Sequence, residues 1–151
     1  MWESCTEGAR KAVLGAQEEA LRLDHDYAGS GHLLLGLLGG ENDDPATEVL
    51  RGFGVTLDRG RAWIEDRVGR GQQGSRSSAR PKFTPRSKKA SELALREAKI
   101  IRQELMGTDH LLLELVREGE EPAMGMLIDL GVEPEAVRRE LERMRDVEHP
   151  T

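Results

Sequence analysis

The chain has 151 residues and a net charge of −6, with 33% charged and 3% aromatic residues, a length suited to one compact domain or two small halves sharing a core. A single cysteine excludes an internal disulfide, and no apolar run is long enough to cross a membrane. Because the amino terminus, MWESCTEGA, is acidic where a secretory signal is basic and then apolar, we expect a cytoplasmic protein.

The first half of the chain predicts four helices. The first carries an apolar stripe at intervals of three or four residues, formed by Ala9, Val13, Ala16, Ala20 and Leu23. Ser30 is a good N-cap for a second helix, whose leucines face several directions and so predict a central position. Asp44 and Pro45 open a third helix that stops at Gly54, and a fourth runs from about 58 to 68. Since β-branched residues are scarce, the predicted class is all-α.

A stretch without periodicity, GRGQQGSRSSARPK (69–82), follows and reads as a flexible linker. We therefore divide the chain into repeat one (1–68), a linker (69–83) and repeat two (84–148). Seven basic residues and no acidic one lie between Arg70 and Lys89. They form either a solvated linker or a contact for phosphates or an acidic partner. The overall negative charge argues against general nucleic-acid binding.

The second half repeats the first. An offset of 78 residues superposes GTDHLLLELV (107–116) on GSGHLLLGLL (29–38), and an offset of 77 pairs later positions such as Pro122 with Pro45. Thr84 and Pro85 start a helix, Thr108 caps a second, a third runs from Pro122 to Gly131, and a fourth covers about 134–144. The apolar stripe of the first of these helices is Ala90, Ala94, Ala98, Ile101 and Leu105. This tandem duplication predicts two similar subdomains packed against each other.

The motifs AQEEALRL, GSGHLLLGLL, KFTPRSKK and GTDHLLLELV, in this order, closely resemble the amino-terminal repeat domain of the Clp (Hsp100) unfoldases of the ClpC type. The resemblance covers nearly the whole chain. It implies two four-helix repeats in pseudo-twofold arrangement that receive substrates and adaptors for an ATPase. The chain has no Gly-x-x-x-x-Gly-Lys-Ser/Thr loop to hold nucleotide phosphates, so we expect a binding module without enzymatic activity or cofactor.

The resemblance also implies a phosphoarginine site. In the family each repeat reads Gly-Thr-Glu-His, and the two glutamates pair with the guanidinium group. This chain has Gly31 and Asp109 at those positions. Glycine offers no carboxylate and aspartate is shorter by one methylene, so phosphoarginine binding is in question. Asp109 alternatively complements the helix dipole in a first helical turn.

A second surface implied by the resemblance binds cyclic peptide antibiotics. The matching positions are Trp2, Phe83, Arg86, Lys88 and Glu92. They would form an aromatic clamp with a charged rim, unless the two aromatic residues only cover helix ends. Cys5 replaces a family phenylalanine beside this surface, which puts the shape of the pocket in question.

Other candidate residues favour structural roles. His32 and His110 occupy equivalent positions, which duplication explains more simply than a zinc site, because further ligands are not spaced around them. Asp24 to Tyr27 reads as a turn. Cys5 has no adjacent base and is predicted to be a buried or half-buried thiol.

The leading hypothesis is a monomeric receptor domain that binds Clp clients, adaptors or cyclic peptides and so modulates or protects the ClpC machinery, in its sharpest form as a decoy. The alternatives are a reader of phosphoarginine-marked proteins and a substrate-receptor fragment of a larger Clp ATPase. A small hydrolase or metalloenzyme using Cys5, His32 or His110 is a third class. No membrane or nucleic-acid partner is expected.

Overall fold

The computed structural model describes residues 5–41, 44–71, 81–100 and 105–148. Within these ranges the chain forms eight helices and two very short strands, which confirms the all-α class and four helices in each half. The elements are α1 (Glu7–Arg22), β1 (Tyr27–Ala28), α2 (Ser30–Leu38), α3 (Pro45–Gly52), α4 (Leu57–Arg67), β2 (Lys82–Phe83), α5 (Pro85–Ile100), α6 (Thr108–Glu118), α7 (Ala123–Asp129) and α8 (Pro134–Glu148). Trp2, Ile101 and most of the predicted linker lie outside the described residues.

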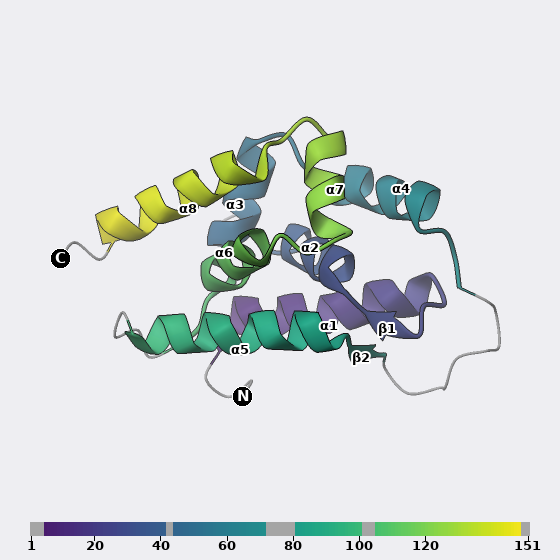
Figure 1. Ribbon diagram of the computed structural model, residues 1–151, viewed down its shortest axis with the longest axis horizontal. Coiled ribbons are helices and arrows are strands. Elements are labelled where there is room, and N and C mark those ends of the chain that lie inside the picture. The colour runs from purple at the N-terminus through teal and green to yellow at the C-terminus, as the bar shows by residue number, and fades with distance from the viewer. Residues whose placement is uncertain (1–4, 42–43, 72–80, 101–104, 149–151) are drawn as a thin grey trace.

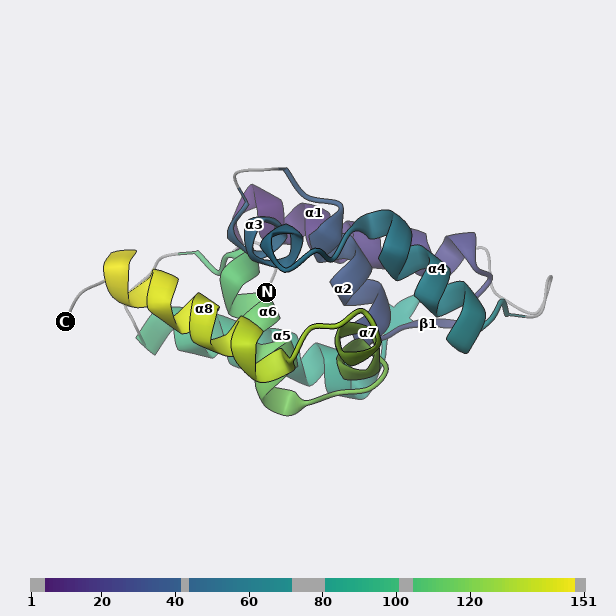
Figure 2. The same ribbon diagram turned by 90° about the horizontal axis from the view of Figure 1, so that it is seen from above.

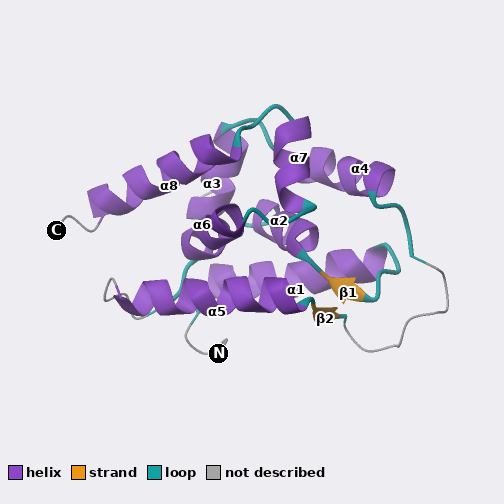
Figure 3. Cartoon of the chain, viewed as in Figure 1, coloured by secondary structure: helices purple, strands orange, loops and turns teal. Residues whose placement is uncertain are grey.

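The helices are arranged in layers. Figure 1 shows α1 and α5 along the lower side, α2 and α6 in the middle, and the remaining four helices above them. Seen from above, α4 and α8 extend toward opposite ends of the molecule (Figure 2). The two strands lie together beside one end of α1 (Figure 3). This arrangement gives α2 and α6 the central positions that their leucine content predicts.

The two halves exchange backbone hydrogen bonds. β1 pairs in parallel with β2, and the Thr84 N–H next to that pair donates to the Ala28 carbonyl over 2.9 Å. At the equivalent place in the other half, the Thr6 N–H donates to the Met106 carbonyl over 2.9 Å. Part of the predicted linker, residues 82–83, is therefore strand. Each half holds the start of the other half's first helix.

Threonine caps the first helix of each half. The Ala9 N–H donates to the Thr6 hydroxyl over 3.1 Å, and the Ser87 N–H donates to the Thr84 hydroxyl over 3.2 Å. These bonds satisfy N–H groups that have no partner within the helix. The predicted start at Thr84 and Pro85 is confirmed.

Ser30 and Thr108 have a different role from the predicted one. The glycine that precedes each of them is the N-cap. The Ser30 hydroxyl accepts from the Ala123 N–H over 3.1 Å, and the Thr108 hydroxyl accepts from the Ala46 N–H over 3.3 Å. The prediction of a side-chain cap was wrong because both hydroxyls bind the first turn of a helix in the opposite half.

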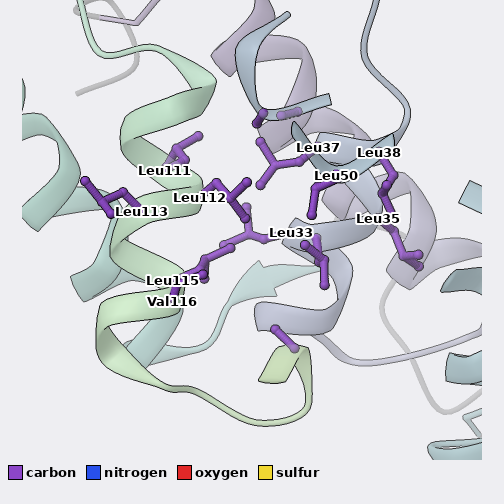
Figure 4. Close-up of a cluster of buried hydrophobic side chains, with 14 of the residues drawn as sticks. Leu33, Leu35, Leu37, Leu38, Leu50, Leu111, Leu112, Leu113, Leu115 and Val116 are labelled. Atoms are coloured by element: carbon purple, nitrogen blue, oxygen red, sulfur yellow. The ribbon is translucent and has the colours of Figure 1, made fainter. Parts of the chain in front are cut away.

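The core is formed by the leucine-rich helices. All nine residues of α2 are buried, and Figure 4 shows side chains of α2 and α6 directed toward each other, with Leu112 and Leu33 between the two helices. On α5 the predicted stripe residues Ala90, Ala94 and Ala98 are buried. Leu105 was wrongly included in that stripe, because it follows the end of α5 and is 45% exposed.

Candidate functional site

A long open groove runs beside α1. Its volume is about 950 Å³. It is bounded by Thr6 and one side of α1 as far as Glu19, by the end of α2, and by Asp44 and Pro45. The rest of its boundary is formed by α4 at Leu57 and Arg61, and by Leu105 and residues 107–110 around the start of α6. We call this site the α1 groove. It draws on both halves of the chain, and the pseudo-twofold arrangement is what brings the start of α6 to α1.

Glycines line much of the α1 groove. Gly15 and Gly36 let the backbones of α1 and α2 approach closely, since a Cβ at Gly36 would overlap the Ala12 carbonyl oxygen. Gly39 and Gly40 continue the lining beyond α2. Because none of these residues projects a side chain, the space above the helices stays open.

The equivalent surface of the second half is built differently. At the offset of 78 residues, the four groove glycines correspond to residues with large side chains. Gly15, Gly36, Gly39 and Gly40 correspond in this order to Leu93, Glu114, Arg117 and Glu118. The Arg117 guanidinium lies 3.1 Å from the Glu114 carboxylate and is also paired with Glu97 and Glu142. Side chains and their ion pairs therefore cover the surface that glycines leave bare in the first half.

Carboxylates dominate the charged lining of the α1 groove. Six acidic side chains line it, namely Glu7, Glu18, Glu19, Glu41, Asp44 and Asp109, against the two cations Lys11 and Arg61. Glu19 is nearly buried and pairs with Arg61, whose Nη2 lies 2.6 Å from its Oε1. The exposed Glu7 and Lys11 side chains lie 3.5 Å apart. The excess negative charge favours a cationic occupant.

Asp44 and Asp109 are held at one end of the α1 groove. The Thr108 hydroxyl donates to the Asp44 carboxylate over 2.6 Å. Gly8 leaves room for this carboxylate, since a Cβ there would lie 2.5 Å from it. Asp109 is in the first turn of α6 with its side chain 21% exposed, and its Oδ1 lies 3.5 Å from His110 Nδ1. Two acidic groups thus face the groove from neighbouring positions.

The α1 groove also has apolar walls. Leu14 of α1 is 37% exposed and Leu105 is 45% exposed. Leu57 and Pro45 complete this part of the lining. Exposed leucines beside carboxylates make the groove suitable for a guest that has both apolar and charged groups.

The two residues implied for phosphoarginine binding, one in each repeat, lie in different surroundings. Asp109 lines the α1 groove, whereas Gly31 does not. Gly31 is buried in the first turn of α2. A Cβ at this position would lie 2.8 Å from Ile64 Cδ1 and 3.0 Å from Pro122 Cγ. Gly31 therefore meets a packing requirement, and its surroundings are filled.

Of the implied antibiotic surface, four of the five residues are described. Phe83 is half-buried in β2 and packs against the core. Arg86, Lys88 and Glu92 are exposed on α5. Trp2 lies outside the described residues.

The two equivalent histidines have the same local role. His32 Nδ1 accepts from the Gly29 N–H over 3.0 Å, and His110 Nδ1 accepts from the Gly107 N–H over 2.8 Å. Each ring thereby binds the backbone at the start of its helix. Within the described residues, no group of three or more His, Cys, Asp and Glu side chains could hold a metal ion.

Cys5 is buried, as predicted. Burial raises the pKa of its thiol, with Arg10 acting in the opposite direction. A raised pKa disfavours the reactive thiolate. The thiol is a packing group at the seam between the halves.

Sequence reasoning missed most of the α1 groove. The sequence pointed to Asp109 as a binding residue and to His110 as a candidate ligand, but Glu18 and Glu41 were not considered and Asp44 was assigned only to the start of a helix. A signal was available in the duplication itself, because Gly36 and Gly39 align with Glu114 and Arg117. Positions where one copy has glycine and the other a large side chain mark surfaces that differ between the halves.

The comparisons with known proteins agree with this architecture. The Clp repeat (R) N-terminal domain family matches residues 4–130. The chain belongs to this family.

Relatives of this Clp N-domain are found among much longer proteins. It is 43% identical over 144 residues to the ATP-dependent Clp protease ATP-binding subunit ClpA homolog of Cyanidium caldarium, covering 95% of this chain and 16% of that protein. It is 42% identical to the chloroplastic chaperone protein ClpC1 of Arabidopsis thaliana, over 95% of this chain and 15% of that protein. The chain thus spans about one sixth of the length of these relatives.

Solved Clp N-domains have the same fold. The N-terminal domain of ClpD from Arabidopsis thaliana superposes with a TM-score of 0.77 at 22% identity, covering 95% of this chain and 96% of that one. A ClpV N-domain in complex with a VipB peptide superposes with a TM-score of 0.65 at 14% identity, covering 91% and 84%. Clp N-domains are non-catalytic binding domains. None of the helices described here has the length and apolarity needed to span a bilayer.

Proposed function

We propose that this Clp N-domain is a receptor for peptide segments of clients or adaptors, and that the α1 groove holds the segment. The observation that carries the proposal is the groove itself, about 950 Å³ in volume and lined by glycines, leucines and carboxylates. Polar groups beside apolar walls are typical of ligand sites. The ClpV N-domain solved with a VipB peptide offers a precedent for peptide binding on this fold.

The length of the α1 groove suits an extended peptide. From Thr6 to Glu19, α1 advances about 20 Å at 1.5 Å per residue. An extended chain rises about 3.3 Å per residue, so about six residues would match this length. We therefore infer that the guest is a short linear segment.

A blocking variant tests the proposal. Gly39 lines the α1 groove, and a Cβ there would make only ordinary contacts, 3.7 Å from the nearest backbone oxygens. Gly39→Leu should place a side chain in the groove without straining the backbone. A library of fluorescent hexapeptides is screened by anisotropy, and Gly39→Leu is expected to weaken the best binder about tenfold or more, equivalent to about 1.4 kcal/mol.

Gly52→Leu is the matched control. Gly52 is exposed at the end of α3, has open space around its Cβ position and does not line the groove. It should leave peptide affinity unchanged. If both leucine variants bind as the wild type does, the peptide lies elsewhere and the proposal fails.

Phosphoarginine reading is a narrower alternative at the same site. Asp109 supports it, since a carboxylate in the α1 groove can accept from a guanidinium group. The packing of Ile64 and Pro122 around Gly31 speaks against a second, equivalent site. Crystals soaked in free phosphoarginine test this alternative by the presence or absence of bound density beside Asp109.

We also propose a second surface, around Phe83, for cyclic peptides. Its support is that Phe83 is half-buried while Arg86, Lys88 and Glu92 are exposed nearby along the chain. Binding there would sequester such compounds and protect the Clp machinery as a decoy. Calorimetry with a cyclic peptide of the cyclomarin type should give measurable heat with the wild type and none with Phe83→Ala. Equal affinities would remove this proposal.

We further propose that the domain acts in the cytoplasm as a monomer. The single cysteine is consistent with a reducing compartment. The packing of two internal halves already satisfies a twofold interface. Light scattering coupled to size exclusion should give a mass close to 16.8 kDa.

A further inference from the structure

The charges that line the α1 groove do not balance. Arg61 is engaged by Glu19, and Lys11 lies beside Glu7. The acidic side chains left over are those of Glu18, Glu41, Asp44 and Asp109. The lining therefore presents a surplus of carboxylates to whatever enters.

These carboxylates are spread along the groove. Asp44 and Asp109 both line the groove near the start of α6, where the Thr108 hydroxyl donates to the Asp44 carboxylate. Glu18 lies toward the other end of α1, about two turns of helix beyond Lys11. A guest would consequently meet negative charge at more than one point along its length.

Exposed leucines accompany the carboxylates. Leu14 projects from α1 one turn before Glu18, and Leu105 lies close in sequence to Asp109. A purely hydrophilic cation would leave these side chains in water. The lining is complementary to a segment in which cationic and apolar residues are mixed.

The second half of the chain provides an internal comparison. Where the groove has Gly39, the second half has Arg117, whose guanidinium lies among Glu97, Glu114 and Glu142. In the second half the Arg117 guanidinium thus lies over α5 and α6, the helices equivalent to α1 and α2. In the first half Glu19, the counterpart of Glu97, is already paired with Arg61 and Arg22, and Gly39 has no side chain at the position of Arg117.

We propose that the α1 groove selects peptide segments bearing unmodified lysine or arginine among apolar residues. This inference rests on the proposed peptide-binding function and names the class of peptide. Guanidinium and ammonium groups pair with the carboxylates, and apolar side chains cover Leu14 and Leu105. A phosphate on the arginine would add negative charge to an acidic surface and weaken binding.

Four hexapeptides with one leucine scaffold test this proposal. The polar positions carry arginine, citrulline, glutamate or phosphoarginine, and affinity is measured by fluorescence anisotropy at low and high salt. The arginine peptide is expected to bind about tenfold or more tightly than the citrulline peptide, with the difference shrinking at high salt. The glutamate and phosphoarginine peptides should bind most weakly.

Substitution of acidic lining residues tests whether the preference for arginine arises in the α1 groove. Glu18→Gln, Glu41→Gln and Asp109→Asn are combined in one protein, and the preference for arginine over citrulline should fall to about threefold or less. Glu48→Gln is the matched control, because Glu48 is an exposed acid on α3 that does not line the groove. It should keep the full preference.

The possible results separate the two proposals. Equal binding of arginine and citrulline peptides, blocked by Gly39→Leu, would overturn the charge preference and leave peptide binding intact. Tighter binding of the phosphoarginine peptide would also overturn it. Binding of none of the four peptides, or a charge preference that the triple variant retains, would overturn the inference as well.

Discussion

At the residue scale, His32 belongs to a chain of three hydrogen bonds in which the donor and the acceptor of each bond are fixed. Because its Nδ1 accepts from the Gly29 N–H, a neutral ring carries its proton on Nε2. That N–H donates to His25 Nδ1 over 2.8 Å, and His25 Nε2–H donates to the Gly69 carbonyl over 2.6 Å. The His32 ring is neutral in this arrangement. The chain ties the segment after α4 to the turn before α2.

This arrangement predicts acid sensitivity. Burial, reinforced by His25 and opposed by Glu19, lowers the pKa of His32 to about 4. In the unfolded chain the His32 side chain takes up a proton near pH 6.5, whereas in the folded chain it does so only near pH 4. The free energy of unfolding therefore decreases as the pH falls from 7 toward 4. From this shift His32 accounts for about 2 kcal/mol of lost unfolding free energy between pH 7 and 4.5.

His32→Gln measures that contribution. Glutamine keeps an acceptor for the Gly29 N–H but does not titrate. Urea unfolding at pH 7 and at pH 4.5 should show a loss of stability about 2 kcal/mol smaller in the variant than in the wild type. Identical losses in the two proteins would exclude His32 as the source of acid sensitivity.

Gly31 gives a second prediction at this scale. Gly31→Ala should destabilise the fold by about 1–3 kcal/mol, because the new methyl group would lie 2.8 Å from Ile64 Cδ1. Ile64→Val removes that atom. Alone it should cost about 1 kcal/mol, but in the Gly31→Ala background it should cost nothing. A double-mutant cycle by chemical denaturation checks this, and strict additivity would contradict the packing account.

At the element scale, helix ends were predictable where one residue decides the geometry. Gly54 and Gly131 both have φ of 85°, the left-handed conformation that glycine adopts without strain. Ser30 and Thr108 were misassigned because the partners of their hydroxyls come from the other half of the chain. Local sequence patterns contain no information about such partners, and the α1 groove was missed for the same reason.

The crossing of α1 and α2 leads to a prediction for Gly36. Gly36→Ala would push a methyl group into the Ala12 carbonyl, which cannot move away within α1. We expect a loss of about 3 kcal/mol or more in unfolding free energy. Gly52→Ala, at an exposed helical position with open space, should instead be neutral or stabilising by up to about 1 kcal/mol. Thermal or urea unfolding of both variants measures the two changes in unfolding free energy. Equal changes would show that the close approach of α1 and α2 at Gly36 does not contribute to stability.

At the scale of the whole molecule, duplication has given two halves that hold each other but differ in surface. The paired hydrogen bonds from Thr6 and Thr84 follow the pseudo-twofold arrangement. The surface does not, since glycines line the α1 groove where the second half has Glu114 and Arg117. One scaffold therefore presents a groove on one side and an ion-paired surface on the other.

The central claim is that peptide segments bind in the α1 groove, and NMR mapping tests it most directly. The ¹⁵N-labelled chain is titrated with the arginine–leucine hexapeptide. We expect the largest amide shifts at Leu14, Gly15, Gly40 and Asp109, and we expect Gly39→Leu to need about tenfold or more peptide to reach the same shifts. Shifts confined to the neighbourhood of Phe83, or no shifts at saturating peptide, would contradict the claim.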